Sequence, residues 1–302
     1  ATNERGGAIR AGGTVSASGT PFRNNRSRYS GGAIHCGRIG TLDTCVFETN
    51  RCVGPETQQG GAIYCENTNS SDSITNVQFV GNYAQPTNAN QAYGGAIWGY
   101  AFGPFTNCEF RANYATGSDA YGGAIWCYGG NWTNCTFGSN SANTPAGTAQ
   151  GGAVRIERGY TSEANFTNCN FQNNNTDGNS TAGGAIYRYG YALNCANCTF
   201  TGNSAQQGGA AKYEWDGNDY QIAFTQCRFE KNSGNQGAAL WLYGMRRLQL
   251  TDSTFSLNLA FDSGGAVWLA GYYMYSSQFA RNTFYGNIAT NGGGLYMSNV
   301  GG

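Results

Sequence analysis

Apolar and polar residues alternate over short segments along the whole chain. In the stretch 122–140, Ile125 and Cys127 flank the outward position Trp126, and the same two-residue period returns at 135–137. A two-residue period predicts short β-strands, and the Gly and Asn residues between the segments predict tight corners. No window shows a 3.6-residue apolar stripe, so we expect no helix.

The alternating segments recur in units that open on Gly-Gly-Ala-apolar and close on Phe-x-x-Asn. The openings begin at Gly6, Gly31, Gly60, Gly94, Gly122, Gly151, Gly183, Gly208, Gly237, Gly264 and Gly292. The closings begin at Phe22, Phe47, Phe79, Phe110, Phe137, Phe171, Phe200, Phe229, Phe255 and Phe284. Short strands at a constant period predict a parallel β-helix with equivalent residues stacked about 4.8 Å apart. We expect one all-β domain over residues 1–302, with about eleven coils.

Each motif position then has a structural role. The Gly-Gly pair predicts a corner with positive φ or close backbone approach. A second corner is expected six residues before each closing Asn, at Gly19, Asn76, Asn107, Asn134, Asn168, Asn197 and Asp252. The ten Phe residues should stack inside, and the ten closing Asn residues should form a ladder whose amides bridge the coils. We assign no catalysis to these residues.

The alternation of Gly-Gly-Ala-(Ile/Leu/Val) with Phe-x-x-Asn resembles the repeat of the chlamydial polymorphic outer-membrane proteins. The resemblance runs from Gly6 to Tyr296. That family consists of autotransported surface adhesins, so the resemblance implies a right-handed parallel β-helix and an extracellular or cell-surface location. The family also ends in a membrane β-barrel, and this chain stops at Gly302 within a repeat.

Composition narrows the function classes. The 17 basic and 17 acidic residues give no net charge, which removes the electrostatic case for nucleic-acid binding. No run of 18 apolar residues predicts a transmembrane helix. We expect no cofactor and no metal, since the single His and the lone Cys-x-x-Cys pair do not suit a zinc site.

The eleven cysteines allow two interpretations. Six occupy the position two residues before the closing Phe, namely Cys45, Cys108, Cys135, Cys169, Cys198 and Cys227. Three more, Cys36, Cys65 and Cys127, lie two residues after the opening apolar residue. Both columns face inward, so buried thiols are favoured over disulfides. Cys52 and Cys195 lie off the columns, and Cys52, expected in an exposed loop between Asn50 and Gly60, is the first candidate for a bridge to Cys45 or Cys36.

Asn-x-Ser/Thr triplets favour an extracellular protein. The candidate acceptors, in the case of a eukaryotic source, are Asn69, Asn179, Asn131, Asn134, Asn165 and Asn197. Asn69 and Asn179 are expected in loops and are the best of these.

Aromatic residues recur at outward positions of the opening strand. The first column reads Arg10, His35, Tyr64, Trp98, Trp126, Arg155, Tyr187, Lys212, Trp241, Trp268 and Tyr296, and the second, two residues later, includes Glu157 and Glu214. From both columns we define a contact ribbon of Trp98, Tyr100, Trp126, Tyr128, Tyr187, Tyr189, Trp241, Tyr243 and Trp268. Two interpretations stay open: a ladder that only stabilises the sheet, by up to about 1 kcal/mol per pair, or a surface that contacts a glycan or a protein partner.

The favoured function is a non-catalytic extracellular structural or adhesive protein. The alternative is a carbohydrate-active β-helix enzyme, a lyase or hydrolase, which would use the acidic segment from Glu214 to Asp219 around Asp216. A solvated turn is the favoured interpretation of that segment.

The ends of the chain predict self-association. A β-helix exposes unpaired backbone groups at each end, and Leu295 and Met297 should face inward with nothing above them. Either the chain belongs to a longer protein, or a second copy covers the ends. We favour the second, in which copies stack head to tail into a filament and Leu295–Met297 meets the strand at Gly6–Arg10 of the next copy.

Overall fold

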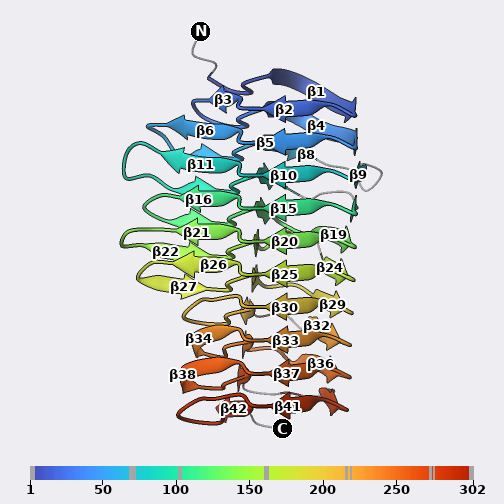
Figure 1. Cartoon of the computed structure of the whole chain (residues 1–302), viewed down its shortest axis with the longest axis vertical. Coiled ribbons are helices and arrows are strands. Elements are labelled where there is room, and N and C mark those ends of the chain that lie inside the picture. Colours follow the sequence, from blue (N-terminus) through green and yellow to red (C-terminus); the bar gives the residue numbers. More distant parts are fainter. Residues whose placement is uncertain are drawn as a thin grey trace.

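The alternating segments form short β-strands that stack in parallel along one long axis (Figure 1). The computed structural model describes residues 4–67, 73–100, 104–159, 163–214, 217, 220–271, 274 and 276–298. None of these residues is helical, and none of their segments could span a membrane as a helix. The structure confirms the predicted all-β parallel solenoid.

The opening strand of each unit belongs to one 19-stranded sheet. The same sheet contains the strand that precedes the position two residues before the closing Phe, which is a Cys in six units. The opening strands are β1 (Ile9–Ser18), β4 (Ile34–Asp43), β8 (Ile63–Asn67), β13 (Ile97–Gly99), β18 (Ile125–Cys127), β23 (Val154–Ile156), β28 (Ile186–Tyr189), β31 (Ala211–Glu214), β35 (Leu240–Tyr243), β39 (Val267–Ala270) and β42 (Leu295–Ser298). The strands before Cys are β9 (Ser73–Thr75), β14 (Phe105–Thr106), β19 (Gly130–Thr133), β24 (Ala164–Thr167), β29 (Leu193–Ala196), β32 (Gln221–Thr225), β36 (Arg247–Thr251) and β40 (Gln278–Ala280).

The strands that carry the closing Phe form a separate ten-stranded sheet. They are β2 (Pro21–Arg23), β5 (Val46–Glu48), β10 (Gln78–Val80), β15 (Glu109–Arg111), β20 (Thr136–Gly138), β25 (Asn170–Gln172), β30 (Thr199–Thr201), β33 (Arg228–Glu230), β37 (Thr254–Ser256) and β41 (Thr283–Tyr285). Ten stacked strands enclose nine complete turns, slightly fewer than the predicted eleven coils, because the last Gly-Gly motif begins a coil that these residues do not close.

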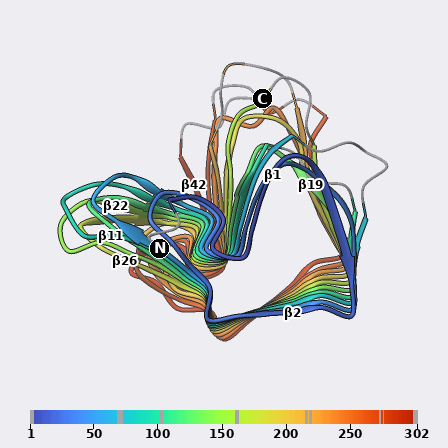
Figure 2. The same ribbon diagram turned by 90° about the horizontal axis from the view of Figure 1, so that it is seen from above.

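A side lobe projects from the solenoid between the closing Asn and the next Gly-Gly (Figure 2). Its outgoing strands are β3 (Arg26–Ser27), β6 (Arg51–Gly54), β11 (Tyr83–Pro86), β16 (Tyr114–Thr116), β21 (Ser141–Asn143) and β26 (Asn175–Asp177). Its returning strands are β7 (Gln58–Gln59), β12 (Ala92–Tyr93), β17 (Ala120–Tyr121), β22 (Thr148–Gln150) and β27 (Ser180–Ala182). Further along the chain the lobe shrinks to the pair β34 (Ser233–Gln236) and β38 (Leu259–Ser263).

The side lobe corrects one expectation from the sequence. The segment between Asn50 and Gly60 is not an exposed loop, because it contributes β6 and β7 to the lobe. Cys52 lies on β6, fully buried, and its thiol donates to Gln58 Oε1 at 2.9 Å. The lobe has its own small core, made of Ala84, Ala92, Ala115, Ala120, Ala142 and Ala149.

The closing motif builds the core as predicted. The ten Phe rings form one continuous stack with centroids 4.7–4.9 Å apart. The closing Asn residues form a buried ladder beside it. Asn140, for example, donates from Nδ2 to Asn174 Oδ1 on the next coil at 3.0 Å and to the Phe110 carbonyl on the previous one at 2.9 Å.

Both predicted corners are present. The first Gly of every opening motif has a φ between 56° and 68°. At the second corner Asn76, Asn107, Asn134, Asn168 and Asn197 all have a φ of 52–55°, in the left-handed region that Asn tolerates.

All eleven cysteines are buried as free thiols, which agrees with the favoured interpretation. In the longer column every thiol except Cys45 donates to a carbonyl on the preceding coil, as Cys169 does to Trp132 at 3.4 Å. Burial raises the pKa of the Cys127 thiol to about 12, so that thiol stays protonated and poorly reactive.

Candidate functional site

The first outward column of the opening strands forms a continuous ladder, here called the outer ladder. Parallel pairing places its members directly above one another, as Trp98 above Trp126. His35, Tyr64 and Trp98 stack with centroids 4.5 Å apart. Further along, Trp241 and Trp268 stack at 4.6 Å.

Two cations continue the outer ladder where aromatic rings are missing. The Arg155 guanidinium lies 4.2 Å from the centroid of the Tyr187 ring, and Lys212 Nζ lies 4.2 Å from that of Trp241. Each is also paired with an acid of the second column, Arg155 with Glu157 and Lys212 with Glu214 at 3.2 Å. Cation–π contacts and ring stacking therefore continue the ladder from Arg155 through Tyr187, Lys212 and Trp241 to Trp268.

The ionisation of Tyr187, Lys212 and Glu214 depends on their burial and on their contacts with one another. Tyr187 donates its hydroxyl to Glu214 Oε2 at 2.7 Å. Burial opposes ionisation of Glu214, but this hydrogen bond and the nearby Lys212 charge outweigh it, so the pKa of the Glu214 carboxyl lies below its usual value. Burial also lowers the pKa of the Lys212 ammonium and raises that of the Tyr187 phenol. The arrangement stabilises an ion pair inside the ladder.

The structure corrects the expected exposure of the outer ladder. Trp98, Trp126 and Trp241 each keep only 7% of their surface exposed, and Tyr187 is also buried. In several units the residue just before the Gly-Gly pair folds back and contacts the outer ladder. Tyr93 packs edge-on against Trp126 at 5.6 Å, and Gln207 accepts a hydrogen bond from Lys212 at 2.8 Å.

The second outward column remains accessible, and we call it the tyrosine edge: Tyr100, Tyr128, Tyr189 and Tyr243. Tyr100 is 49% exposed, and the other three are half-buried. The Tyr100 and Tyr128 rings stack at 5.2 Å. Of the contact ribbon, Tyr100 is the most exposed ring, and Trp268 of the outer ladder is half-buried like Tyr128, Tyr189 and Tyr243.

Four of the candidate glycosylation sites, Asn131, Asn134, Asn165 and Asn197, lie on polar ladders on the outer face of the solenoid. Asn131 and Thr133 are both outward on β19, so the Asn-x-Thr spacing follows from strand alternation. Asn165 donates from Nδ2 to Asn131 at 2.9 Å, Asn134 to Asn107 at 3.2 Å, and Asn197 to Asn168 at 2.8 Å.

A glycan on the Nδ2 of Asn165, Asn134 or Asn197 would compete with these ladder bonds. Asn179 is exposed at the lobe tip, where its Nδ2 donates to the Ala146 carbonyl at 2.9 Å. Asn69 lies outside the described residues. Glycosylation stays a prediction for all six positions.

The carboxylates of the alternative enzyme hypothesis do not converge within the described residues. Glu214 is engaged by Lys212 and Tyr187, while Asp216 and Asp219 lie outside the described part of the chain. No group of three His, Cys, Asp or Glu side chains that could hold a metal ion occurs among the residues that the structure describes.

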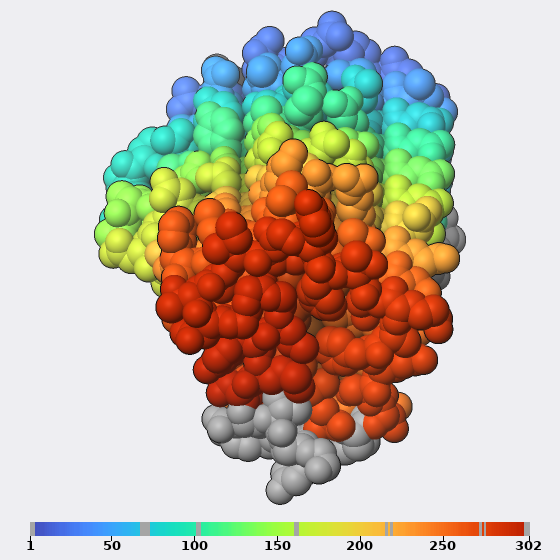
Figure 3. All heavy atoms as spheres, turned by 60° about the horizontal axis from the view of Figure 1, so that its bottom comes forward, coloured from blue at the N-terminus to red at the C-terminus, as the bar shows by residue number. Residues whose placement is uncertain are grey.

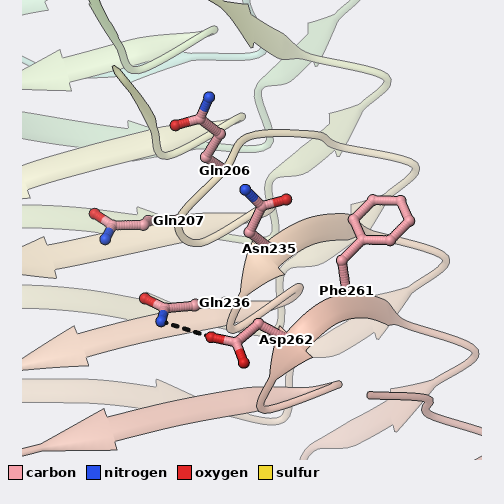
Figure 4. Close-up of a pocket in the computed structure, with 6 residues that line it drawn as sticks. All are labelled: Gln206, Gln207, Asn235, Gln236, Phe261 and Asp262. Atoms are coloured by element: carbon pink, nitrogen blue, oxygen red, sulfur yellow. Dashed lines mark hydrogen bonds between the residues drawn. The ribbon is translucent and has the colours of Figure 1, made fainter. Parts of the chain in front are cut away.

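Sequence reasoning missed a polar hollow of about 440 Å³ beside the shrunken part of the side lobe (Figure 4). It is lined by Gln206, Gln207, Asn235, Gln236, Phe261 and Asp262. The sequence signal for this hollow is the length of the link from the closing Asn to the next Gly-Gly. This link has five residues at 259–263, but four at 204–207, 233–236 and 288–291.

Comparisons with known proteins agree with the motif analysis. The family model of the Chlamydia polymorphic membrane protein repeat matches residues 22–37 and 44–66. A probable outer membrane protein of Chlamydia pneumoniae, pmp7, is 27% identical over 208 residues, which cover 62% of this chain and 20% of that protein. The chain thus spans about a fifth of this relative. No solved structure gives a significant match. The chain carries repeats of the Chlamydia polymorphic membrane protein type, built as stacked coils of a parallel β-solenoid.

Proposed function

We propose that the chain is a non-catalytic structural and adhesive segment of a cell-surface protein, and that copies stack end to end. The outer-membrane relative supports the surface location. The uninterrupted Phe, Asn and outer ladders support a structural role, since each commits its side chains to coil-to-coil contacts rather than to an open catalytic cleft.

One observation carries the proposal of end-to-end stacking. The inward side chains of the last coil form an apolar end face of Phe279, Phe284, Leu295 and Met297. Figure 3 shows the C-terminal end of the solenoid turned forward, in red. Met297 is 50% exposed, whereas Leu269, its register partner one coil earlier, is fully buried. Phe284 is exposed in the same way beside the buried Phe255.

A second copy is the occupant that fits this end face. The first coil has a similar outline to the last (Figure 2), and its partly buried Ile9 would meet the end face, whereas Val15 and Phe22 are already buried within the single copy. A copy in register would pair the open edge of β42 with β1.

Sedimentation velocity over a concentration series tests the stacking. We expect the wild-type chain to associate increasingly with concentration. Met297→Glu should weaken association at least about tenfold, because an unpaired carboxylate would be buried in the interface. Tyr285→Glu is the matched control, since Tyr285 is 70% exposed on the outer face of the same coil. Equal association of both variants and the wild type would contradict the proposal.

The tyrosine edge is the proposed adhesive surface. Its support is the exposure of Tyr100 beside the stacked ring of Tyr128, because open aromatic rings in register are typical of contact surfaces. Replacing Tyr100 and Tyr128 by Ser should reduce binding of the chain to host-cell surfaces in a cell-binding assay, performed at a temperature at which circular dichroism shows the variant to be folded. Unchanged cell binding would leave only a stabilising role for these tyrosines.

A further inference from the structure

The hollow at the side lobe is made by an insertion of one residue. The strands β34 and β38 pair Gly234 with Ala260 and then Gln236 with Ser263, so Asn235 faces two residues, Phe261 and Asp262. Such a bulge unpairs the extra residue and re-aims its side chain. Phe261 is thereby turned outward and is 70% exposed.

The lining of the hollow is rich in groups that both donate and accept hydrogen bonds. Four carboxamides, from Gln206, Gln207, Asn235 and Gln236, surround it together with the Asp262 carboxylate. Gln236 donates from Nε2 to Asp262 Oδ2 at 3.0 Å, which holds the carboxylate in place (Figure 4). No cationic side chain is among the residues that line it.

The Phe261 ring borders a second hollow as well. This neighbour of about 190 Å³ shares Gln206, Asn235 and Phe261 with the first and extends to Asp177 and Thr181 on the longer coils. In Figure 4 the ring stands to one side of Asn235, and Gln207 and Gln236 lie to the other. An exposed ring therefore borders both polar hollows.

We propose that these two hollows form a binding site for a neutral oligosaccharide. The C–H face of a pyranose would lie on the Phe261 ring, whose negative π face attracts the polarised C–H groups. The hydroxyls of adjoining sugar units would donate to Asp262 and exchange hydrogen bonds with the carboxamides on either side. The carboxylate and the lack of a lining cation select against uronic and sialic acids.

This inference deepens the proposed adhesive role and rests on it for its biological use. Sugar binding itself needs neither end-to-end stacking nor the tyrosine edge. Sugar binding is therefore measured on the dispersed chain at low concentration, where an absence of binding would leave the stacking proposal intact. The Met297→Glu variant should bind sugar like the wild type.

Saturation-transfer NMR with maltotriose, mannotriose, N,N′,N″-triacetylchitotriose and trigalacturonic acid tests the site. We expect at least one neutral trisaccharide to receive saturation from the protein, with a Kd on the order of millimolar. Phe261→Ala should weaken its binding at least about tenfold, whereas Phe261→Tyr retains it. Asp262→Asn should also weaken it.

The control is Tyr285→Ala, which removes an equally exposed ring far from the hollows in the fold and should leave binding unchanged. Since Phe261 is exposed, its loss should leave the melting temperature unaltered, which separates a binding defect from unfolding. The proposal is overturned if no neutral trisaccharide binds, if only trigalacturonic acid binds, or if the bound sugar is held equally well by Phe261→Ala.

Discussion

At the scale of single residues, the closing Phe and Asn side chains hold neighbouring coils in register. Each Asn Oδ1 accepts from the backbone N–H and the Nδ2 of the Asn one coil earlier, as Asn140 does from Asn113. A shift by one residue would break all of these bonds and would expose the Phe column. The sequence was sufficient to predict both columns, because alternation and spacing determine which residues stack.

Replacing Phe137 by Ala tests the aromatic column. The ring is fully buried between Phe110 and Phe171, with centroids 4.9 and 4.7 Å away. We expect the free energy of unfolding to fall by about 3–5 kcal/mol, from lost burial and the cavity left behind. Denaturant titration measures it, and Phe261→Ala on the surface should have little effect. A similar small effect at Phe137 would contradict the packed column.

The only histidine predicts a dependence of stability on pH. Burial, reinforced by Arg5 and Arg10, lowers the pKa of His35 below its ordinary 6.5. The folded chain therefore binds this proton less readily than the unfolded chain. The contribution of neutral His35 to stability is fully present above about pH 6.5 and is lost as the pH falls below that value.

Melting temperatures between pH 7.5 and 5.5 check this dependence. The wild type should lose stability toward the acid end, whereas His35→Tyr should be flatter, because a Tyr continues the stack onto Tyr64 without titrating. Parallel pH profiles for the two proteins would show that His35 does not cause the loss.

At the scale of elements, the Gly-Gly corner determines how closely coils approach. The second Gly of each pair faces the next coil, and a Cβ on Gly123 would come within 2.0 Å of the Gly152 carbonyl oxygen. The motif predicted this corner from the sequence. Ala238 takes the second position in one unit, where the amide of Ala210 is shared between the carbonyls of Ala238 and Ala239 at 3.2 and 3.1 Å.

Gly123→Ala should therefore destabilise the solenoid by about 1–3 kcal/mol, since neighbouring backbone must move to admit the methyl group. Gly138→Ala is the matched control: Gly138 is the last residue of β20 in the same coil, and a Cβ there would meet nothing within 4 Å. Thermal unfolding of both variants measures the difference. Equal stability of the two would contradict close backbone packing at the corner.

The side lobe was not predicted, although the sequence holds a signal for it. Tyr83-Ala84 and Tyr114-Ala115 follow the closing Asn in successive units, and Ala92-Tyr93 and Ala120-Tyr121 precede the next Gly-Gly. Alanines alone carry too little apolar surface to mark a core, so the segments looked like loops. Stacking of identical short segments makes that thin core sufficient.

The candidate contact surface was only partly predictable for a related reason. Strand alternation correctly places Trp98 and Trp126 outside the main core. Alternation alone does not show that Tyr93 and Tyr121, just before the Gly-Gly corner, fold back onto the outer ladder. The bulge at Phe261 was equally hidden, because a one-residue insertion changes side-chain direction without changing composition.

At the scale of the whole molecule, the coils have nearly the same outline from one end to the other (Figure 2). The interior is thus a repeated cross-section, and among the described residues the inward side chains of the last coil are more exposed than their register partners one coil earlier. Repetition explains why the fold and the end face could both be predicted from the sequence, whereas coil-specific insertions could not.

Electron microscopy of concentrated protein tests end-to-end stacking most directly. Stacked copies should appear as unbranched filaments whose axial repeat is roughly 50 Å, the height of about ten coils. The Met297→Glu variant should give separate short rods under the same conditions, and Tyr285→Glu should still form filaments. Dispersed rods for the wild type at every concentration, or filaments that persist unchanged in Met297→Glu, would contradict stacking through the apolar end face.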